Sequence, residues 1–286
     1  MSSLNGHADV LREAFDSLIS DPRWPVSSTQ YPSNMLPLAS HEGLARLREC
    51  DAQSQDNFVV AARFFVGQGH LQCATASVAI CLNIIGCIRE KCGTDPVLEP
   101  HRHFTADDLM EELRPKLQPR HRWFSCSLGE IAALASEYAQ VQMCQVVARE
   151  REESNGVKVG DQQQQQQQQQ LVRCDVSNCD EFRRQAMRQL RHGEGCVVVN
   201  FGRQELGYAT SPFAGHMSPV VAYHEASDTL LLLDVARKSW ACVWAPVEAL
   251  FRGMRTTEAP RDERCTPAPR GFLLLSVARN LDLIKM

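Results

Sequence analysis

Three side chains in this sequence are of the types that a thiol-based acyl transfer needs. Cys73 opens an apolar-periodic run, His216 follows Gly215, and Asp234 lies in an otherwise apolar stretch. A cysteine thiolate attacks carbonyl carbons, a histidine can take up and return the proton, and a carboxylate can hold the imidazole in one tautomer. The ordered set therefore predicts a catalytic triad of Cys73, His216 and Asp234.

The position of Cys73 favours its reactivity. Ala76, Ile80 and Ile84 recur at helical spacing after it, so Cys73 is expected where a helix begins. The unpaired backbone N–H groups and the dipole at that end of a helix favour a thiolate. Cys81 lies inside the same expected helix and lacks this advantage. A structural role remains the alternative for Cys73, because cysteine often acts as a small hydrophobe.

His216 and Asp234 can meet if two expected strands pair in the right register. With His224 opposite Asp228, His216 would fall opposite Ala236, and Asp234 would lie one diagonal step away on the same face. A shift of one residue would put the two side chains on opposite faces. An aspartate in an apolar strand is costly unless it is paired, which favours the contact. A purely structural His–Asp pair is the alternative interpretation.

The elements that must position these residues come in an α+β order, with helices early and the sheet late. Apolar periodicity and β-branched content predict the following elements. Helices are expected over 40–47, 73–90, 128–139 and 179–191, and strands over 141–147, 196–201, 217–224, 229–235 and 271–277, the hairpin turning at 225–228.

Composition excludes several classes of protein. The 286 residues are 44% hydrophobic and 22% charged with a net charge of -4, which fits a globular protein and gives no basic footprint for nucleic acid. The N-terminus lacks the regions of a signal peptide, and no apolar run reaches the roughly 18 residues of a membrane span. We therefore expect a cytoplasmic protein with no membrane partner; a homodimer stays open.

The chain reads as one domain with two additions. Residues 1–35 are expected to be an N-terminal extension, and 36–280 the catalytic domain. A run of glutamines over 162–170 cannot bury apolar surface, so about 150–171 is expected to be a disordered insertion.

The cysteines do not form an evident metal site. Twelve cysteines in a chain of this length are not the density of a disulfide scaffold. Cys174 and Cys179 are close enough in sequence for a zinc site, but no second pair nearby completes four ligands. A non-enzymatic thiol protein that binds metal through dispersed cysteines remains an alternative class.

Several segments closely resemble the phytochelatin synthase family, whose members are papain-like glutathione γ-glutamylcysteinyltransferases. The resemblance runs from about residue 36 to 277 around the glutamine insertion, and it is carried by residues 36–43, 72–78, 215–220, 233–237 and 270–276. It implies a papain-like cysteine-protease fold, in which the helix carrying the nucleophile packs on an antiparallel sheet.

The resemblance also implies an activity. Cys73 would attack the Cys–Gly peptide of glutathione and hold a γ-glutamylcysteinyl thioester, with His216 as base and then acid and Asp234 fixing its tautomer. Transfer to a second glutathione or a longer phytochelatin peptide would extend a (γ-Glu-Cys)n-Gly chain in heavy-metal detoxification; transfer to water would make the protein a glutathione hydrolase. No cofactor is expected to be tightly bound, and cadmium or zinc would enter as a glutathione thiolate complex or as an activator.

The family pattern further implies substrate contacts. Arg270 corresponds to an arginine that grips the γ-glutamyl carboxylate, Glu258 stands where the family tends to place an aspartate for the amino group, and Arg237 is a further substrate-binding candidate. Gln68 is the candidate oxyanion donor.

The nucleophile segment departs from the family. Gln72 and Ala74 replace an aromatic residue and a glycine, and Gln68 lies five residues before Cys73 where the family has six. An inactive family member is therefore a further alternative.

Overall fold

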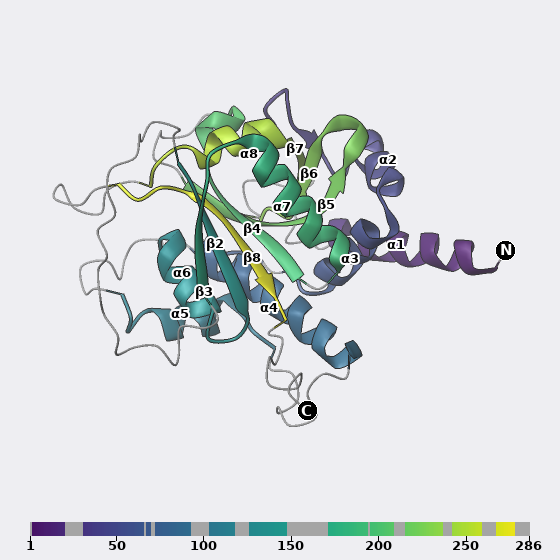
Figure 1. Cartoon of the computed structure of the whole chain (residues 1–286). Helices are drawn as coiled ribbons and strands as arrows, with labels where there is room; N and C mark the ends of the chain where they lie inside the picture. Colours follow the sequence, from purple (N-terminus) through teal and green to yellow (C-terminus); the bar gives the residue numbers. More distant parts are fainter. Residues whose placement is uncertain are drawn as a thin grey trace, which may run out of the picture.

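The protein is described by a computed structural model, which covers residues 2–20, 31–65, 67–69, 72–92, 103–117, 126–147, 171–193, 195–208, 215–236, 242–258 and 267–277. In these residues an eight-stranded sheet lies between two layers of helices (Figure 1). The α+β class predicted from the sequence is confirmed. The expected glutamine insertion lies outside the described residues except at its end, where Leu171 begins a strand.

One mixed sheet organises the molecule. Six of its eight strands pair only antiparallel, and the two strands at one end, β2 and β3, run parallel to each other. In spatial order the strands are β1 (Leu36–Pro37), β7 (Val243–Pro246), β6 (Thr229–Leu232), β5 (Gly215–His224), β4 (Gly195–Gly202), β8 (Gly271–Ser276), β2 (Gln140–Val146) and β3 (Leu171–Val176).

Helix α4 (Cys73–Cys92) lies on one face of this sheet and confirms the helix expected after Cys73. Its side chains are buried from Ala74 to Ile85, as expected for a helix without a polar face. Alternate residues of β4, such as Val198, pack in the same core as this helix. The arrangement confirms that the helix beginning at Cys73 packs on a largely antiparallel sheet.

The opposite face carries α7 (Cys179–His192) and α8 (Val247–Met254). Val197 and Val199 of β4 pack with Phe182 and Leu250 of these helices in a second core. The period of two in a strand therefore divides β4 between two cores, which makes the centre of the sheet buried on both sides.

The remaining helices close the first core. They are α1 (Ser2–Ser20), α2 (His41–Glu49), α3 (Ala52–Arg63), α5 (Ala106–Leu113) and α6 (Leu128–Ala135). Ser40 caps α2 by accepting a hydrogen bond from the Gly43 N–H, as its sequence predicts. The expected helix over 128–139 is too long: α6 ends at Ala135, because Tyr138 turns away to pack edge-on against Phe104.

The hairpin between β5 and β6 corrects the expected register. His224 pairs with Thr229, not with Asp228, because Asp228 takes a left-handed conformation with φ 48° inside the turn. If this one-residue shift continued along the whole hairpin, His216 and Asp234 would lie on opposite faces of the sheet. A bulge between Val220 and Ala222 takes up the extra residue, so that Val220 faces Leu232.

The strand expected over 229–235 is also too long. β6 ends at Leu232, and Asp234 follows it in irregular structure, where its Oδ1 accepts a hydrogen bond from the Ala236 N–H at 2.8 Å. This side-chain contact bends the backbone as an Asx turn does and ends the sheet pairing.

Among the described residues, no helix has the length and apolarity needed to cross a bilayer.

Candidate active site

The structure brings the three predicted residues together where β5 begins. His216 Nε2 lies 2.8 Å from Asp234 Oδ1, and both residues are nearly inaccessible to solvent. Cys73, at the first turn of α4, is within hydrogen-bonding reach of the same imidazole. The imidazole therefore lies between a thiol and a carboxylate, which is the order a triad requires.

The surroundings of Cys73 favour its thiolate. Burial alone would raise the pKa of the Cys73 thiol, but the hydrogen bond and charge of His216, the backbone N–H of Met217 and the charge of Arg203 together bring that pKa below its ordinary value. Cys81, the next cysteine along α4, lacks these stabilising contacts. It is fully buried beside Cys196, and the pKa of its thiol is raised well above the ordinary value.

Asp234 supplies the negative charge on the other side of the imidazole. Burial opposes its ionisation, but Arg203, His216 and the Ala236 N–H hold the pKa of this carboxyl well below its usual range. Asp234 in turn raises the pKa of His216 above its ordinary value, against burial and the repulsion from Arg203. A lowered thiol pKa beside a raised imidazole pKa favours the thiolate–imidazolium form of the pair.

Arg203 belongs to this site and was missed by the sequence analysis. It opens the short 3-10 helix Arg203–Leu206 after β4, is 5% exposed, and places Nη2 at 3.3 Å and 3.1 Å from the two oxygens of Asp234. Tyr208 covers its guanidinium at 5.3 Å. The argument that identified Asp234 from the sequence applies to Arg203 as well, because a charged residue next to a buried apolar strand requires a partner.

A second group of polar side chains lies beside the triad. Arg270 is 3% exposed and donates to Asn200 Oδ1 at 2.9 Å, while Asn200 donates to Glu258 Oε1 at 2.6 Å. The guanidinium of Arg270 packs directly over Gly215, where an added Cβ would meet its Nη1 at 2.1 Å. This group, which we call the Arg–Asn–Glu cluster, therefore adjoins His216 through Gly215.

Electrostatics also link the cluster to the nucleophile. Burial lowers the pKa of Arg270, and the charges of Glu258 and of the Cys73 thiolate oppose that effect. Glu258 Oε1 additionally accepts from the Leu128 N–H at 3.1 Å, at the start of α6. Asn200 is a second residue that the sequence analysis missed.

The loop before the nucleophile is tied down at both ends. The Gln68 N–H donates to the carbonyl of Val235 at 2.7 Å. Val235 directly follows Asp234 in the sequence, so this bond holds Gln68 close to Asp234. Gln72 accepts from the Gly69 N–H at 3.0 Å and donates to Asp107 of α5 at 2.8 Å. The backbone of Gln68 therefore lies beside the segment that carries Asp234, and its role as oxyanion donor stays a prediction. Arg237 lies outside the described residues.

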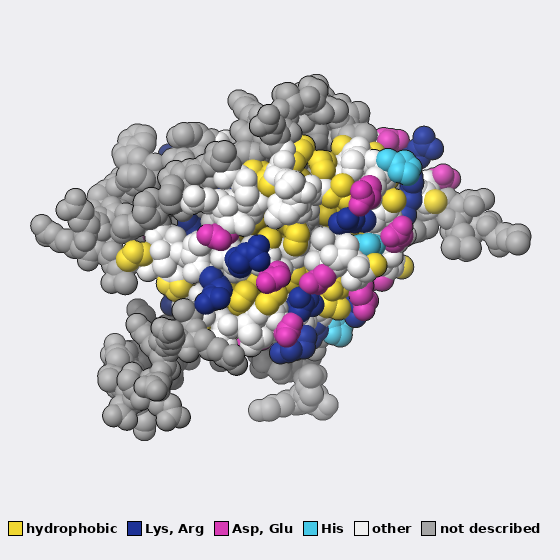
Figure 2. All heavy atoms as spheres, turned by 90° about the horizontal axis from the view of Figure 1, so that it is seen from above, with side chains coloured by type: hydrophobic (Ala, Val, Ile, Leu, Met, Phe, Trp, Pro, Cys, Tyr) yellow, Lys and Arg dark blue, Asp and Glu magenta, His cyan; other side chains and the backbone are white. Residues whose placement is uncertain are grey.

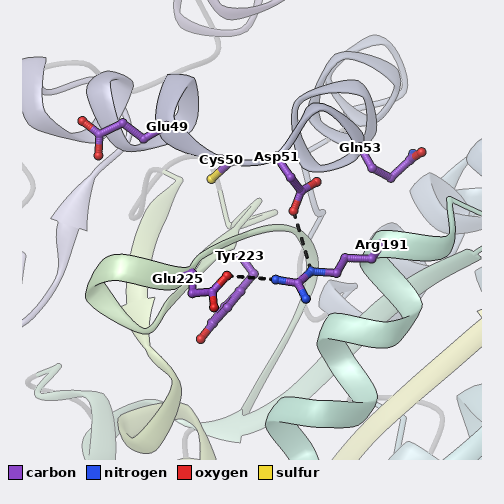
Figure 3. Close-up of a pocket in the computed structure, with 7 residues that line it drawn as sticks. All are labelled: Glu49, Cys50, Asp51, Gln53, Arg191, Tyr223 and Glu225. Carbon is purple, nitrogen blue, oxygen red and sulfur yellow. Dashed lines mark hydrogen bonds and ion pairs between the residues drawn. The ribbon is translucent and has the colours of Figure 1, made fainter.

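A pocket of about 550 Å³ lies elsewhere, at the far end of β5, and its lining residues form two ion pairs through Arg191 (Figure 3). It is lined by Glu49, Cys50, Asp51, Gln53, Arg191, Tyr223 and Glu225. At about 3.3 Å per residue along β5, Tyr223 is roughly 20 Å from His216. Burial and two neighbouring carboxylates raise the pKa of the Cys50 thiol to about 12, so this thiol is not a nucleophile.

No metal cluster stands out in the described part of the chain. No group of three or more His, Cys, Asp or Glu side chains there could hold a metal ion, and Cys174 and Cys179 gain no further ligands. On the face in Figure 2, acidic and basic side chains are interspersed. The triad and the Arg–Asn–Glu cluster are the two groups of described residues whose arrangement is suited to chemistry.

Comparison with known proteins gives a consistent result. A model of the family described as phytochelatin synthase matches residues 26–272. A Lotus japonicus protein named glutathione gamma-glutamylcysteinyltransferase 1 is 32% identical over 100 residues, 35% of this chain and 18% of that protein. Proteins of the same activity name from Triticum aestivum and Schizosaccharomyces pombe are each 32% identical, over 37% of this chain and 20% and 24% of their own lengths. The matched stretch thus spans about a fifth of each of these relatives.

The electrostatics of the triad predict how Cys73 reacts with iodoacetamide. Because its pKa is lowered, the thiolate persists below the pH at which an ordinary cysteine is protonated, and alkylation should continue there. In His216→Ala the main lowering contact is lost while burial remains, so the rate at neutral pH should fall about tenfold for each unit by which the pKa rises. Peptide mass spectrometry measures the Cys73 rate, with unreactive Cys81 as internal control. Equal pH profiles in both proteins would contradict the assignment.

Proposed function

The chain belongs to the phytochelatin synthase family, and on that premise we propose that it is a glutathione γ-glutamylcysteinyltransferase acting through a thioester on Cys73. The observation that carries the proposal is the contact of a buried thiol, whose pKa is lowered, with an imidazole that a charged carboxylate holds from its other side. This arrangement supports nucleophilic acyl transfer.

In the first half of the proposed reaction, glutathione loses its glycine. The Cys73 thiolate attacks the carbonyl carbon of the Cys–Gly peptide, and the C–N bond breaks as the imidazolium of His216 gives its proton to the departing amine. The product is a γ-glutamylcysteinyl thioester and free glycine. Asp234, charged and buried, keeps the imidazole in the tautomer that faces Cys73.

In the second half, the amino group of a second glutathione or of a longer phytochelatin attacks the thioester. His216, now neutral, takes the proton of that amine, a peptide bond forms, and the C–S bond breaks to return the thiolate. Each cycle therefore lengthens the acceptor by one γ-Glu-Cys unit. If water takes the place of the amine, the product is free γ-glutamylcysteine, and the protein acts as a hydrolase.

The Arg–Asn–Glu cluster is suited to hold the γ-glutamyl end of the donor. Arg270 presents the planar donor group that pairs with a carboxylate, and Glu258 offers a negative charge for the amino group of the same substrate. Gln68 remains the proposed donor to the oxyanion, and Arg237 a proposed further substrate contact. A removed oxyanion donor costs about 10²–10³ in rate, which sets the scale of Gln68's proposed contribution.

Cadmium or zinc is proposed to enter as substrate. Soft thiolates such as glutathione bind these ions, and the metal–glutathione complex would be the species that is lengthened. The cytoplasm, where glutathione thiols stay reduced, is the proposed location.

Purified protein incubated with glutathione and cadmium should produce (γ-Glu-Cys)n-Gly peptides and glycine, measured by mass spectrometry. Cys73→Ser should make neither, because a hydroxyl in this setting is not ionised as the thiol is. Cys81→Ser, which alters a buried thiol of the same helix, is the matched control and should retain activity. Free γ-glutamylcysteine alone would instead establish hydrolysis, and no turnover by the wild type would overturn the proposal.

The role proposed for Glu258 predicts a change in substrate choice. Wild type should prefer glutathione over glutaryl-Cys-Gly, which lacks the amino group, by about 10-fold or more in kcat/KM. Glu258→Gln keeps the oxygen that accepts from Asn200 and Leu128 but removes the charge, so this preference should largely disappear.

Glu258→Asp is the control for that experiment, since it retains the charge and should keep part of the preference. Steady-state kinetics with both substrates measure all three proteins. An unchanged preference in Glu258→Gln would show that the carboxylate does not face the amino group.

A further inference from the structure

The outer edge of β3 ends the sheet (Figure 1). β3 pairs with β2 on one side, and no strand among the described residues pairs with its other side. Exposed edges of this kind present unpaired backbone donors and acceptors to other chains. The side chains along the edge decide which chain they suit.

The backbone groups that point outward can be assigned. The Val147 N–H donates to the carbonyl of Val176 at 3.1 Å, so the polar groups of Val176 face β2. Alternation along a strand then turns those of Cys174 toward β2 as well, and those of Arg173 and Asp175 outward. An added antiparallel strand would therefore form its hydrogen bonds with Arg173 and Asp175.

The outward residues carry opposite charges two positions apart, and both are exposed. In an antiparallel pair, a residue whose backbone N–H and C=O point to the free edge must lie opposite a residue whose backbone groups point to the free edge of the other strand. We propose that β3 pairs with β3 of a second copy of this chain, about a two-fold axis at Cys174. In that register Arg173 faces Asp175 of the second copy, and Asp175 faces its Arg173.

The neighbouring self-pairings are disfavoured by charge. A two-fold axis at Arg173 would place two arginines opposite each other, and an axis at Asp175 would place two aspartates opposite each other. A two-fold axis between two residues would place residues whose backbone groups point to the free edge opposite residues whose groups point to β2. The hydrogen bonds between the two copies would then not form. The sequence of β3 is thus complementary to itself in one register.

The same register also covers an exposed apolar side chain. Val172 is 51% exposed in the single chain, and in the dimer it lies opposite Val176 of the second copy, which is buried in its own chain. The interface uses the same patch on both chains, so it closes as a two-fold dimer and does not continue into a fibre. A single six-residue strand buries less than a permanent interface does, so the dimer should dissociate on dilution.

Sedimentation velocity over a concentration series tests the interface by reversing charges. Wild type should shift from monomer to dimer as concentration rises. Arg173→Asp and Asp175→Arg each place like charges opposite each other, and each should raise the dimer Kd by about tenfold. The double variant, with the two charges exchanged, should restore the wild-type Kd.

Arg184→Asp is the matched control, because it makes the same reversal on an exposed residue of α7 and should leave the Kd unchanged. Circular dichroism checks that each variant is folded. A wild type that stays monomeric at every concentration overturns the proposal, as does a dimer that both single variants retain.

Cross-linking gives a second readout in the same proteins. Directly opposed residues that do not hydrogen-bond lie about 4.5 Å apart at Cα, a separation that a disulfide spans. Diamide, which takes up the two electrons and two protons of a thiol pair, should join two chains through Cys174. Cys174→Ser should stop the joining, and cross-linking that persists in this variant at the wild-type level would contradict the two-fold axis at Cys174.

Discussion

The buried negative charge of Asp234 is the constraint on which the rest of the candidate site depends. Burial opposes the ionisation of a carboxylate in this position and raises its pKa. Arg203 and the Ala236 N–H keep it charged, and it then raises the pKa of His216, which in turn lowers that of Cys73. The reactivity of the thiol is therefore set by a chain of contacts that ends at an arginine outside the triad.

The fold supplies this arrangement through the middle of its sheet. β4 leads into Arg203, β5 begins with His216, and the chain leaving β6 provides Asp234, so neighbouring strands deliver three of the charges to one end of the sheet. Helix α4 brings the thiol to the same end from one face. β8 follows directly on Arg270, which joins the Arg–Asn–Glu cluster to the triad.

Patterns that depend on short stretches of sequence predicted the structure well. The periodicity after Cys73 identified α4, and the cap at Ser40 identified the start of α2. Residue type and order also predicted that Cys73, His216 and Asp234 would lie together, while their catalytic roles stay predictions. The register of the β5–β6 hairpin was wrong at the turn, since neither the left-handed Asp228 nor the bulge near Val220 follows from apolar alternation.

The residues that were missed share a physical feature. Asn200 and Arg203 derive their place from partners far along the chain, and only the assembled sheet brings those partners near. The parallel pairing of β2 with β3 was missed for the same reason, because it joins strands separated by the long glutamine-containing segment. Long-range pairings of this kind leave no local pattern in a single sequence.

In the proposed reaction, Cys73 carries the γ-glutamylcysteinyl group between donor and acceptor. Rapid acid quenching of the protein with glutathione, followed by intact-mass and peptide-mass spectrometry, measures this group directly. We expect an adduct equal to glutathione less glycine, located on the Cys73 peptide and released by hydroxylamine as thioesters are. An adduct of whole glutathione, which is a mixed disulfide, or an acyl group on another cysteine would contradict it.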